Sequence, residues 1–208
     1  MTARNLEALQ ALAGESVNCV IAWPASAIGR DGVINLRRKF GELRRVLAKT
    51  GSVWLRLADT GQRDELAGMP WRAALALQAD GWIVRNAVVL QRSISLEREE
   101  RRLGSAHELL FLLVKERTYY FDLDALGETS GTGVRELRAK RPGDVWSVER
   151  DGNRGGCLRL TLRCIAATCP PGGTVLDPFC SKGTTAVAAR QLGRNFVGVT
   201  PDVMRSAA

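Results

Sequence analysis

The chain has 208 residues, of which 45% are hydrophobic and 25% charged, a composition typical of a soluble globular protein with a substantial core. No stretch approaches the roughly 20 apolar residues of a membrane span, and the start of the chain lacks the apolar segment of a signal peptide, so a cytoplasmic protein is predicted. The net charge of +8 leaves two interpretations open, a polyanionic partner such as nucleic acid or an incidentally basic surface.

The cysteine and histidine content argues against a metal site. Five cysteines occur, none of them in a Cys-x-x-Cys pair, and the single histidine, His107, lies far from them in the sequence. Structural zinc sites need clustered cysteine and histidine ligands, so no metal is predicted. In a cytosolic protein these cysteines are expected to be buried free thiols.

The first half of the chain alternates between strand patterns and helical patterns. The run at residues 17–22, Val-Asn-Cys-Val-Ile-Ala, is short and apolar, as in a buried strand. Leu36, Phe40 and Leu43 recur at helical spacing. Pro70 suits the first turn of a further helix. The predicted elements are a helix around residues 6–13, a strand at 17–22, a helix at 36–48, a strand at 52–57, a helix at 70–77, and strands at 82–91 and 109–115.

The second half contains a weakly patterned region and then a compact alternation of elements. Residues 127–156 are rich in Gly, Arg and polar residues, and no regular element is predicted there. A helix is predicted at 158–168, a strand at 174–177, a helix at 185–192 and a strand at 196–200. This alternation favours an α/β fold, a mostly parallel sheet with helices on both faces, built as one domain over residues 1–208.

The tail of the chain carries a specific resemblance. Residues 173–185, Gly-Thr-Val-Leu-Asp-Pro-Phe-Cys-Ser-Lys-Gly-Thr-Thr, are similar to the cofactor strand and loop of the DNA amino-methyltransferases. Residues 193–199, Gly-Arg-Asn-Phe-Val-Gly-Val, resemble the strand that follows. These enzymes use S-adenosylmethionine to methylate the exocyclic nitrogen of adenine or cytosine. Further motifs of the family are matched in order by residues 70–72, 79–82, 105–108, 119–122 and 141–146.

The order of the motifs resembles the circularly permuted β class of this family. The strand that leads into the catalytic loop comes first, at residues 17–22, and the cofactor loop comes last. The resemblance implies a Rossmann-like methyltransferase fold in which both loops lie at the carboxyl ends of strands, where open α/β sheets bind their ligands. Trp23 and Phe179 are therefore expected at neighbouring strand ends.

The catalytic loop departs from the family's pattern. In the family it reads Asp/Ser/Asn-Pro-Pro-aromatic: a side-chain oxygen and a backbone carbonyl accept the hydrogens of the target amine, and the ring stacks on a flipped base. Here Trp23 takes the acceptor position with an indole N–H that can only donate. Pro24 retains its carbonyl, and Ser26 stands where the ring belongs. These three are the candidate catalytic residues. Trp23 marks either the simple loss of the hydrogen-bond acceptor or an aromatic ring that stacks on the base from a different position in the loop.

The cofactor loop departs as well. Similar proteins read Phe-x-Gly-x-Gly, in which glycines let the backbone approach the cofactor closely. Phe179 and Gly183 match, but Ser181 replaces the first glycine. The family's ribose-binding acid is replaced by Thr200, with Asp202 two residues later, and residues 153–157 lack the family's His-x-x-x-Phe-Pro-like segment. The implied cofactor-binding residues are Asp177, Phe179, Ser181, Lys182, Gly183, Thr184, Thr200 and Asp202; for Asp177 a turn-forming role is an open alternative.

A basic cluster lies in the weakly patterned region, which corresponds to the family's target-recognition segment. Contact with the phosphates of double-stranded DNA is favoured there over a merely solvated surface. For His107, in the Ser-Ala-His-Glu motif, a structural role at a strand start is favoured over catalysis. The candidate DNA-binding residues are Arg135, Arg138, Lys140, Arg141, Arg150 and Arg154.

Three hypotheses follow. In the first, the chain is a DNA-binding protein on a methyltransferase scaffold that has lost methyl transfer and needs no cofactor, acting alone, as a homodimer or as the partner subunit of a methyltransferase. In the second, it is an active S-adenosylmethionine-dependent methyltransferase with an atypical loop. In the third, Lys182 holds a different, anionic donor. Divergence at four separate points of contact with base or cofactor places the first hypothesis ahead of the second.

Overall fold

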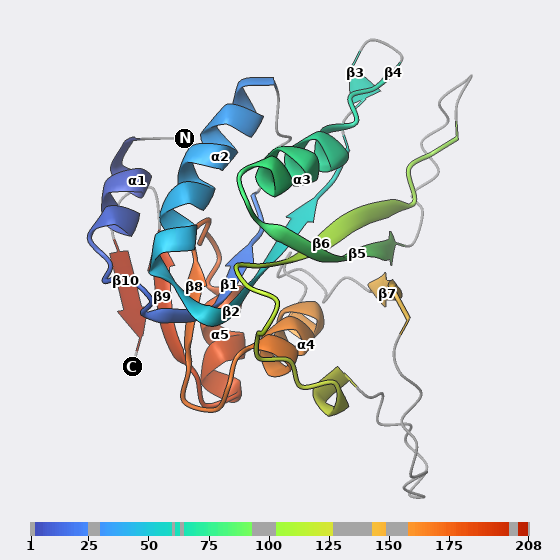
Figure 1. Cartoon of the computed structure of the whole chain (residues 1–208). Helices are drawn as coiled ribbons and strands as arrows, with labels where there is room; N and C mark the ends of the chain where they lie inside the picture. Colours follow the sequence, from blue (N-terminus) through green and yellow to red (C-terminus); the bar gives the residue numbers. More distant parts are fainter. Residues whose placement is uncertain are drawn as a thin grey trace, which may run out of the picture.

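The computed structural model of the chain describes residues 3–24, 30–59, 61–62, 65–92, 103–126, 143–148, 158–199 and 204–207. Its strands are β1 (Val17–Ala22), β2 (Leu47–Leu57), β3 (Gly61–Gln62), β4 (Glu65–Leu66), β5 (Ile83–Arg92), β6 (His107–Val114), β7 (Val145–Val148), β8 (Thr174–Asp177), β9 (Asn195–Val199) and β10 (Met204–Ala207). Within the described residues, eight of them form one sheet in the order β10-β9-β8-β1-β2-β6-β5-β7, and β3 pairs with β4 (Figure 1).

The large sheet is mixed and mostly parallel, which confirms the predicted fold class. The strands β9, β8, β1 and β2 run parallel as consecutive neighbours, and β7 runs parallel to β5. The strand β6 is antiparallel to both of its neighbours, and β10 is antiparallel to β9. The parallel block therefore contains the first strand and the strands of the tail, as the permuted motif order requires.

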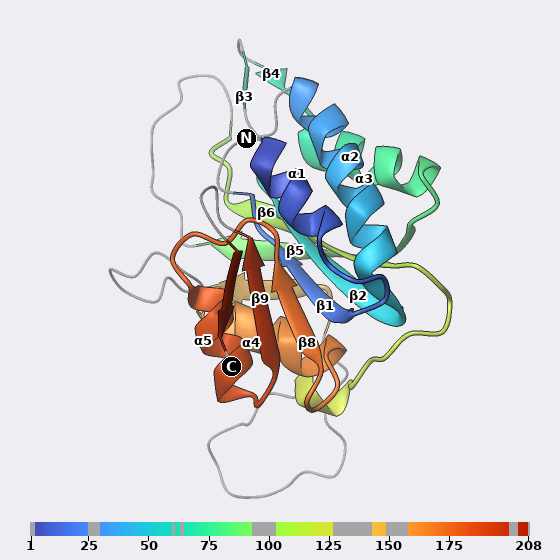
Figure 2. The same ribbon diagram turned by 90° about the vertical axis from the view of Figure 1, so that its left-hand side faces the viewer.

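Helices cover both faces of the sheet. One face carries α1 (Ala3–Gln10), α2 (Arg30–Val46) and α3 (Met69–Ala79), and the other carries α4 (Leu158–Thr168) and α5 (Thr184–Gln191), with the short 3-10 helix η1 (Asp124–Leu126) beside α4 (Figure 2). Side chains of β1 alternate between the two faces: Val20 and Ala22 on the first, Cys19 and Ile21 on the second. All four are fully buried, so the strand reads as a continuous apolar run.

Each face has its own buried cluster of side chains. In the first core, beneath α1 to α3, the apolar stripe of α2 packs on the sheet, and the rings of Phe40 and Trp82 meet edge to face at 5.6 Å. In the second core, beneath α4 and α5, the Trp54 indole N–H donates to the Thr168 hydroxyl (2.9 Å) and the Cys164 carbonyl (3.2 Å). Truncation of a ring such as Phe40 to alanine would cost about 3–5 kcal/mol.

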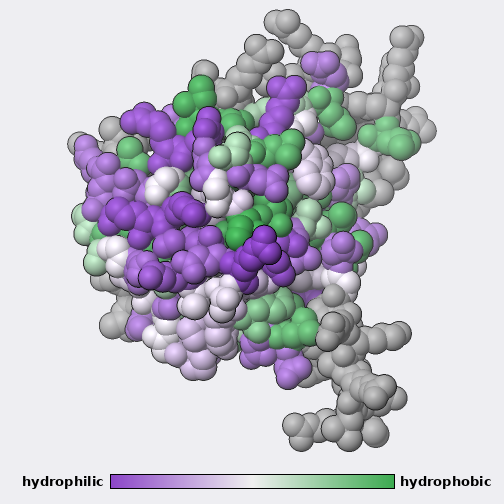
Figure 3. All heavy atoms as spheres, in the orientation of Figure 1, coloured by the Kyte–Doolittle hydropathy of each residue, from purple (hydrophilic) through white to green (hydrophobic). Residues whose placement is uncertain are grey.

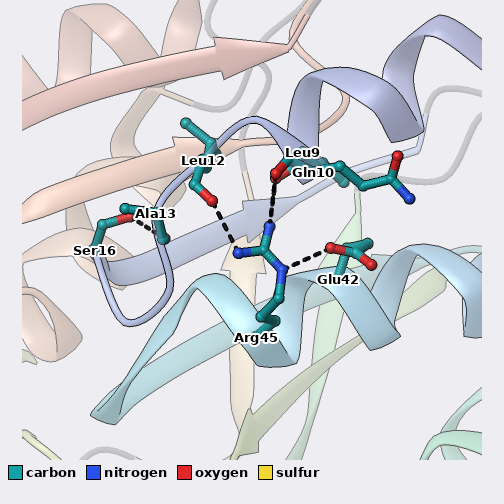
Figure 4. Close-up of polar contacts among 7 residues, drawn as sticks. All are labelled: Leu9, Gln10, Leu12, Ala13, Ser16, Glu42 and Arg45. Atoms are coloured by element: carbon teal, nitrogen blue, oxygen red, sulfur yellow. Dashed lines mark hydrogen bonds and ion pairs between the residues drawn. The ribbon is translucent and has the colours of Figure 1, made fainter.

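Arg45 of α2 ties α1 to the rest of the molecule (Figure 4). Its two terminal nitrogens donate to the carbonyls of Leu9 (3.0 Å), Gln10 (3.2 Å) and Leu12 (2.9 Å), and its Nε donates to Glu42 (2.9 Å). Carbonyls at the end of a helix have no partner within the helix, so the guanidinium satisfies groups that would otherwise need water.

Four cysteines lie in the described part of the chain, and all are buried free thiols, as expected: Cys19, Cys164, Cys169 and Cys180. Burial raises the pKa of the Cys169 thiol to about 11, so the neutral thiol prevails at physiological pH. In the same part of the chain, no helix is both long and apolar enough to cross a membrane.

The structure corrects three predicted elements. The helix α2 starts at Arg30, earlier than the predicted residue 36, and ends at Val46, so residues 47–51 extend β2. Pairing of Val17 with Leu47 stabilises that extension. The region 127–156, predicted to lack regular structure, contains the edge strand β7, and a further edge strand, β10, follows residue 200. Both strands are four residues long, too short for a period in the sequence to stand out.

Candidate functional site

The carboxyl ends of β1 and β8 lie side by side at one edge of the sheet. Val20 of β1 pairs with Leu176 of β8 in parallel register. Trp23 and Phe179 each stand three residues beyond this pair. The loops after the two strands therefore leave the sheet at the same level, and the predicted juxtaposition of Trp23 and Phe179 at neighbouring strand ends is confirmed.

Asp177 shapes the turn that follows β8. Its side chain is buried, and burial raises the pKa of the carboxyl above its ordinary value, against the opposing effect of its hydrogen bonds. One carboxylate oxygen accepts from the Phe179 N–H (2.9 Å) and the other from the Thr185 hydroxyl (2.6 Å). These bonds fasten the turn to the start of α5, so Asp177 has the turn-forming role; its contact with a cofactor stays a prediction.

Gly183 ends this turn in the left-handed region, with φ of 75° immediately before α5. A Cβ at this position would meet no described atom within 4 Å, so the backbone conformation rather than lack of space favours glycine. The side chains of Ser181 and Lys182 are exposed, and Thr184, the first residue of α5, is half-buried. Ser181, which replaces the family's first glycine, and Lys182, which lies between the two glycine positions, therefore project toward solvent.

Trp23 is half-buried and packs against the second core. The guanidinium of Arg56, in β2, lies over its ring, with 5.5 Å from Cζ to the ring centroid. Arg56 also forms an ion pair with the buried Glu108 of β6. Among the described residues the indole N–H of Trp23 finds no acceptor. Arg56 thus occupies a face of the indole ring, and the sheet holds the ring in place.

A buried lysine of α2 lies beside the cofactor turn. Lys39 is 5% exposed, and its Nζ lies 4.7 Å from the centroid of the Phe179 ring. Burial lowers the pKa of its amine to about 8. Within the described residues Nζ makes no hydrogen bond.

The sequence predictions did not include Lys39, Arg56 or Glu108 in the site. A signal for Lys39 existed, because the lysine stands between Leu36 and Phe40 in the apolar stripe of the helix. Glu108 is an acid at the start of an otherwise apolar strand, which is also unusual. Its neighbour His107 is exposed at the first position of β6, and the structural role expected of it stays a prediction.

Several predicted site residues lie outside the described part of the chain, and their roles stay predictions. From the catalytic loop this applies to Ser26, whereas Trp23 and Pro24 are described. From the cofactor site it applies to Thr200 and Asp202. All six residues of the predicted DNA-binding cluster are also outside: Arg135, Arg138, Lys140, Arg141, Arg150 and Arg154.

Comparisons with known proteins identify relatives over most of the chain. Residues 33–202 match the family model described as DNA methylase, for N6 and N4 methyltransferases. The chain is 30% identical to the Type II methyltransferase M.Cfr9I of Citrobacter freundii, over 93% of this chain and 80% of the relative. It is 29% identical to M.SmaI of Serratia marcescens, over 93% and 82%. The alignments run over 244 and 243 positions, more than the 208 residues here, so these relatives carry segments that this chain lacks.

Solved structures share the fold. The cytosine-N4-specific PvuII DNA methyltransferase superposes with a TM-score of 0.80 at 14% identity, covering 93% of this chain and 78% of that one. M1.HpyAVI, solved in complex with S-adenosylmethionine, gives a TM-score of 0.63 at 20% identity, covering 95% and 90%. The match to the family model spans well over half of the chain, in agreement with the permuted sheet and its paired loops. The chain belongs to the DNA methylase family of N6 and N4 amino-methyltransferases.

Proposed function

We propose that this chain is an S-adenosylmethionine-dependent DNA methyltransferase that acts on the exocyclic amine of cytosine or adenine. The observation that carries the proposal is the register of β1 and β8, which places the Trp23–Pro24 loop level with the Phe179 turn. The relatives named above are Type II methyltransferases. They favour this second hypothesis of the sequence analysis over the first, in which methyl transfer is lost.

The described residues of the β8 turn fit an adenosyl cofactor. When bound, S-adenosylmethionine supplies a methyl group on a positively charged sulfur. Ser181 and Lys182 point to solvent, so neither side chain fills the packed part of the turn. The amine of Lys39 is a buried polar group for which the described residues supply no hydrogen-bond partner. A ligand with an oxygen acceptor would satisfy it.

Pro24 is the proposed acceptor for the target amine. An exocyclic amine is a poor nucleophile because its lone pair is delocalised into the base, and acceptance of its hydrogens makes that lone pair more available. The indole of Trp23 can only donate, so the carbonyl of Pro24 is the acceptor that this part of the loop retains. The contact of Trp23 with Arg56 holds the loop in position. Arg56 and Glu108 are therefore proposed as positioning residues.

Double-stranded DNA is the proposed substrate. The net charge of +8 supports a polyanionic partner, and the basic residues between Arg135 and Arg154 are proposed to contact its phosphates. The additional segments of the relatives are absent here, so this chain has less surface with which to read a sequence. We expect a target sequence shorter or less strictly read than those of the longer relatives.

Transfer of a labelled methyl group tests the proposal. The purified chain is incubated with tritiated S-adenosylmethionine and mixed-sequence duplex DNA, and mass spectrometry of the nucleosides distinguishes N4-methylcytosine from N6-methyladenine. We expect transfer, reduced about ten- to a hundredfold in Pro24→Ala, because proline fixes the backbone that aims the carbonyl. Pro171→Ala is the matched control, because this exposed proline precedes the amino end of β8 and lies away from the carboxyl edge of the sheet.

The opposite result also has a clear meaning. If the unmodified chain binds duplex DNA but neither binds S-adenosylmethionine nor transfers label, the methyltransferase proposal is wrong. The first hypothesis, a DNA-binding protein on this scaffold, would then hold.

A further inference from the structure

Among the described residues two lysines are largely buried, and they differ in their partners. The Lys115 side chain is 13% exposed; its Nζ donates to the Leu47 carbonyl at 2.8 Å and lies 3.7 Å from the Glu15 carboxylate. Lys39 is more deeply buried, at 5% exposure, yet its Nζ has no hydrogen-bond acceptor among the described residues. A buried ammonium without an acceptor is costly, so this contrast requires an explanation.

The position of Lys39 directs its amine to the carboxyl edge of the sheet. Helical side chains lean toward the N-terminus of their helix, and α2 begins at the edge where β1 ends. The Nζ accordingly reaches the Phe179 ring, 4.7 Å from its centroid, in the turn after β8. A cation–π contact offsets only part of the cost of burying the charge.

The carboxylate of the same turn is not the missing partner. Both oxygens of Asp177 are engaged, one by the Phe179 N–H and the other by the Thr185 hydroxyl. Among the described residues, the charges that remain around this turn are positive: Lys39 itself, the exposed Lys182, and the partial positive charge at the N-terminus of α5. The electrostatic environment of the Phe179 turn therefore favours an anion.

We propose that the amine of Lys39 binds the α-carboxylate of S-adenosylmethionine, an inference that rests on the proposed function. The carboxylate is the anionic group of this cofactor, and a buried ammonium–carboxylate bond would satisfy both charges. The same amine repels the sulfonium. Lys39 thus orients the cofactor, with its amino-acid end toward α2 and its methyl group away from it.

A comparison of two ligands that differ only in the carboxylate tests this assignment. Calorimetry measures the binding of S-adenosylmethionine and of decarboxylated S-adenosylmethionine to the wild type, to Lys39→Met and to Lys39→Gln. We expect Lys39→Met to weaken binding of the intact cofactor about ten- to a hundredfold and not to weaken binding of the decarboxylated ligand, which carries only positive charge. Lys39→Gln keeps a donor without the charge and should fall in between. Lys49→Met, at an exposed lysine of β2, is the control.

Each contrary result has its own consequence. Unchanged affinity of Lys39→Met and Lys39→Gln for the intact cofactor overturns the assignment, and so does an equal loss for both ligands, which would place the contact elsewhere on the cofactor. Wild-type protein that binds neither ligand overturns the proposed function together with the inference. The first two results leave the proposed function intact, so the two failures are distinguishable.

Discussion

At the scale of single residues, Lys39 makes stability depend on pH. Its amine has a pKa of about 8 in the folded chain and an ordinary value of 10.5 when unfolded. Between these values the unfolded chain binds a proton that the native chain has released, so the free energy of unfolding rises with pH in this window. Below about pH 8 the native chain bears the full cost of the buried charge.

Replacement of Lys39 by methionine should therefore stabilise the ligand-free protein at neutral pH. We expect a gain of about 1 kcal/mol at pH 7, less than the full pKa shift implies because the amine retains part of its solvation. The gain should shrink as the pH approaches 10.5. Urea denaturation of the wild type and of Lys39→Met, from neutral pH to pH 10.5, measures this difference in the free energy of unfolding. A difference that does not change with pH would show that the amine is not desolvated in solution.

The residues of the site differ in how far the sequence alone could identify them. Trp23, Phe179 and Gly183 stand in motifs whose order along the chain fixes their neighbourhood, and their placement agrees with it. Lys39 and Glu108 belong to no quoted signature of the cofactor or catalytic loop. Their position depends on helix-to-sheet and strand-to-strand packing, which a linear motif does not contain.

At the scale of elements, β2 and α4 each carry a buried hydroxyl, and the two hydroxyls differ in their hydrogen bonds. Ser52 of β2 is fully buried, and its hydroxyl has no partner in the described part of the chain. Thr168 of α4 is also fully buried, but its hydroxyl accepts from the Trp54 indole (2.9 Å) and donates to the Cys164 carbonyl (2.9 Å). The same kind of group is therefore unsatisfied in the strand and fully used in the helix.

Alanine at these two positions should change stability in opposite directions. Ser52→Ala removes an unsatisfied hydroxyl and should raise the free energy of unfolding by about 1 kcal/mol. Thr168→Ala leaves the Trp54 N–H with the longer bond alone and should lower it by about 1–3 kcal/mol. Chemical denaturation of the two variants side by side provides the measurement. A loss of stability in Ser52→Ala would mean that its hydroxyl has a partner, such as water, in solution.

The elements best predicted from sequence are those with strong local patterns. The strands at 17–22 and 174–177 and the helix at 158–168 have the predicted bounds, because apolar runs and helical periods are properties of neighbouring residues. Residues 47 and 48 were assigned to a helix but belong to β2, where Leu47 pairs with Val17 of β1, and β7 is held by backbone bonds to β5. Pairing between distant segments decides such cases, and local propensity does not reveal it.

At the scale of the whole molecule, the surface is that of a charged globular protein. Hydrophilic side chains dominate the face formed by α1, α2 and α3, and apolar residues there form smaller separate patches (Figure 3). The exposed apolar residues include Ile34 of α2 and Trp71 and Leu75 of α3. Trp71 and Leu75 stand one turn apart on α3, and small apolar patches of this kind are normal on a protein surface, so they indicate no particular partner.

The basic net charge predicts a salt-dependent affinity for duplex DNA. Each neutralised phosphate releases condensed counterions, so the logarithm of affinity should fall linearly with the logarithm of salt concentration, with a slope of about 0.9 per contact. If the cluster between Arg135 and Arg154 makes these contacts, alanine at Arg138, Lys140 and Arg141 should weaken binding and flatten the slope by up to about three such contacts. Fluorescence anisotropy with a labelled duplex, across a salt series, gives both quantities.

A second triple variant distinguishes the effect of net charge on DNA affinity from the effect of a specific phosphate-binding surface. Alanine at Arg38, Lys49 and Arg117 removes the same three charges from exposed positions on the described body. Long-range attraction alone would make the two triple variants indistinguishable, because both variants lower the net charge by the same amount. Direct phosphate contact would flatten the slope only for the first variant, since only contacted cations displace counterions. An equal slope in both variants would therefore show that the basic residues between Arg135 and Arg154 are ordinary solvated surface. Another part of the molecule would then contact the DNA.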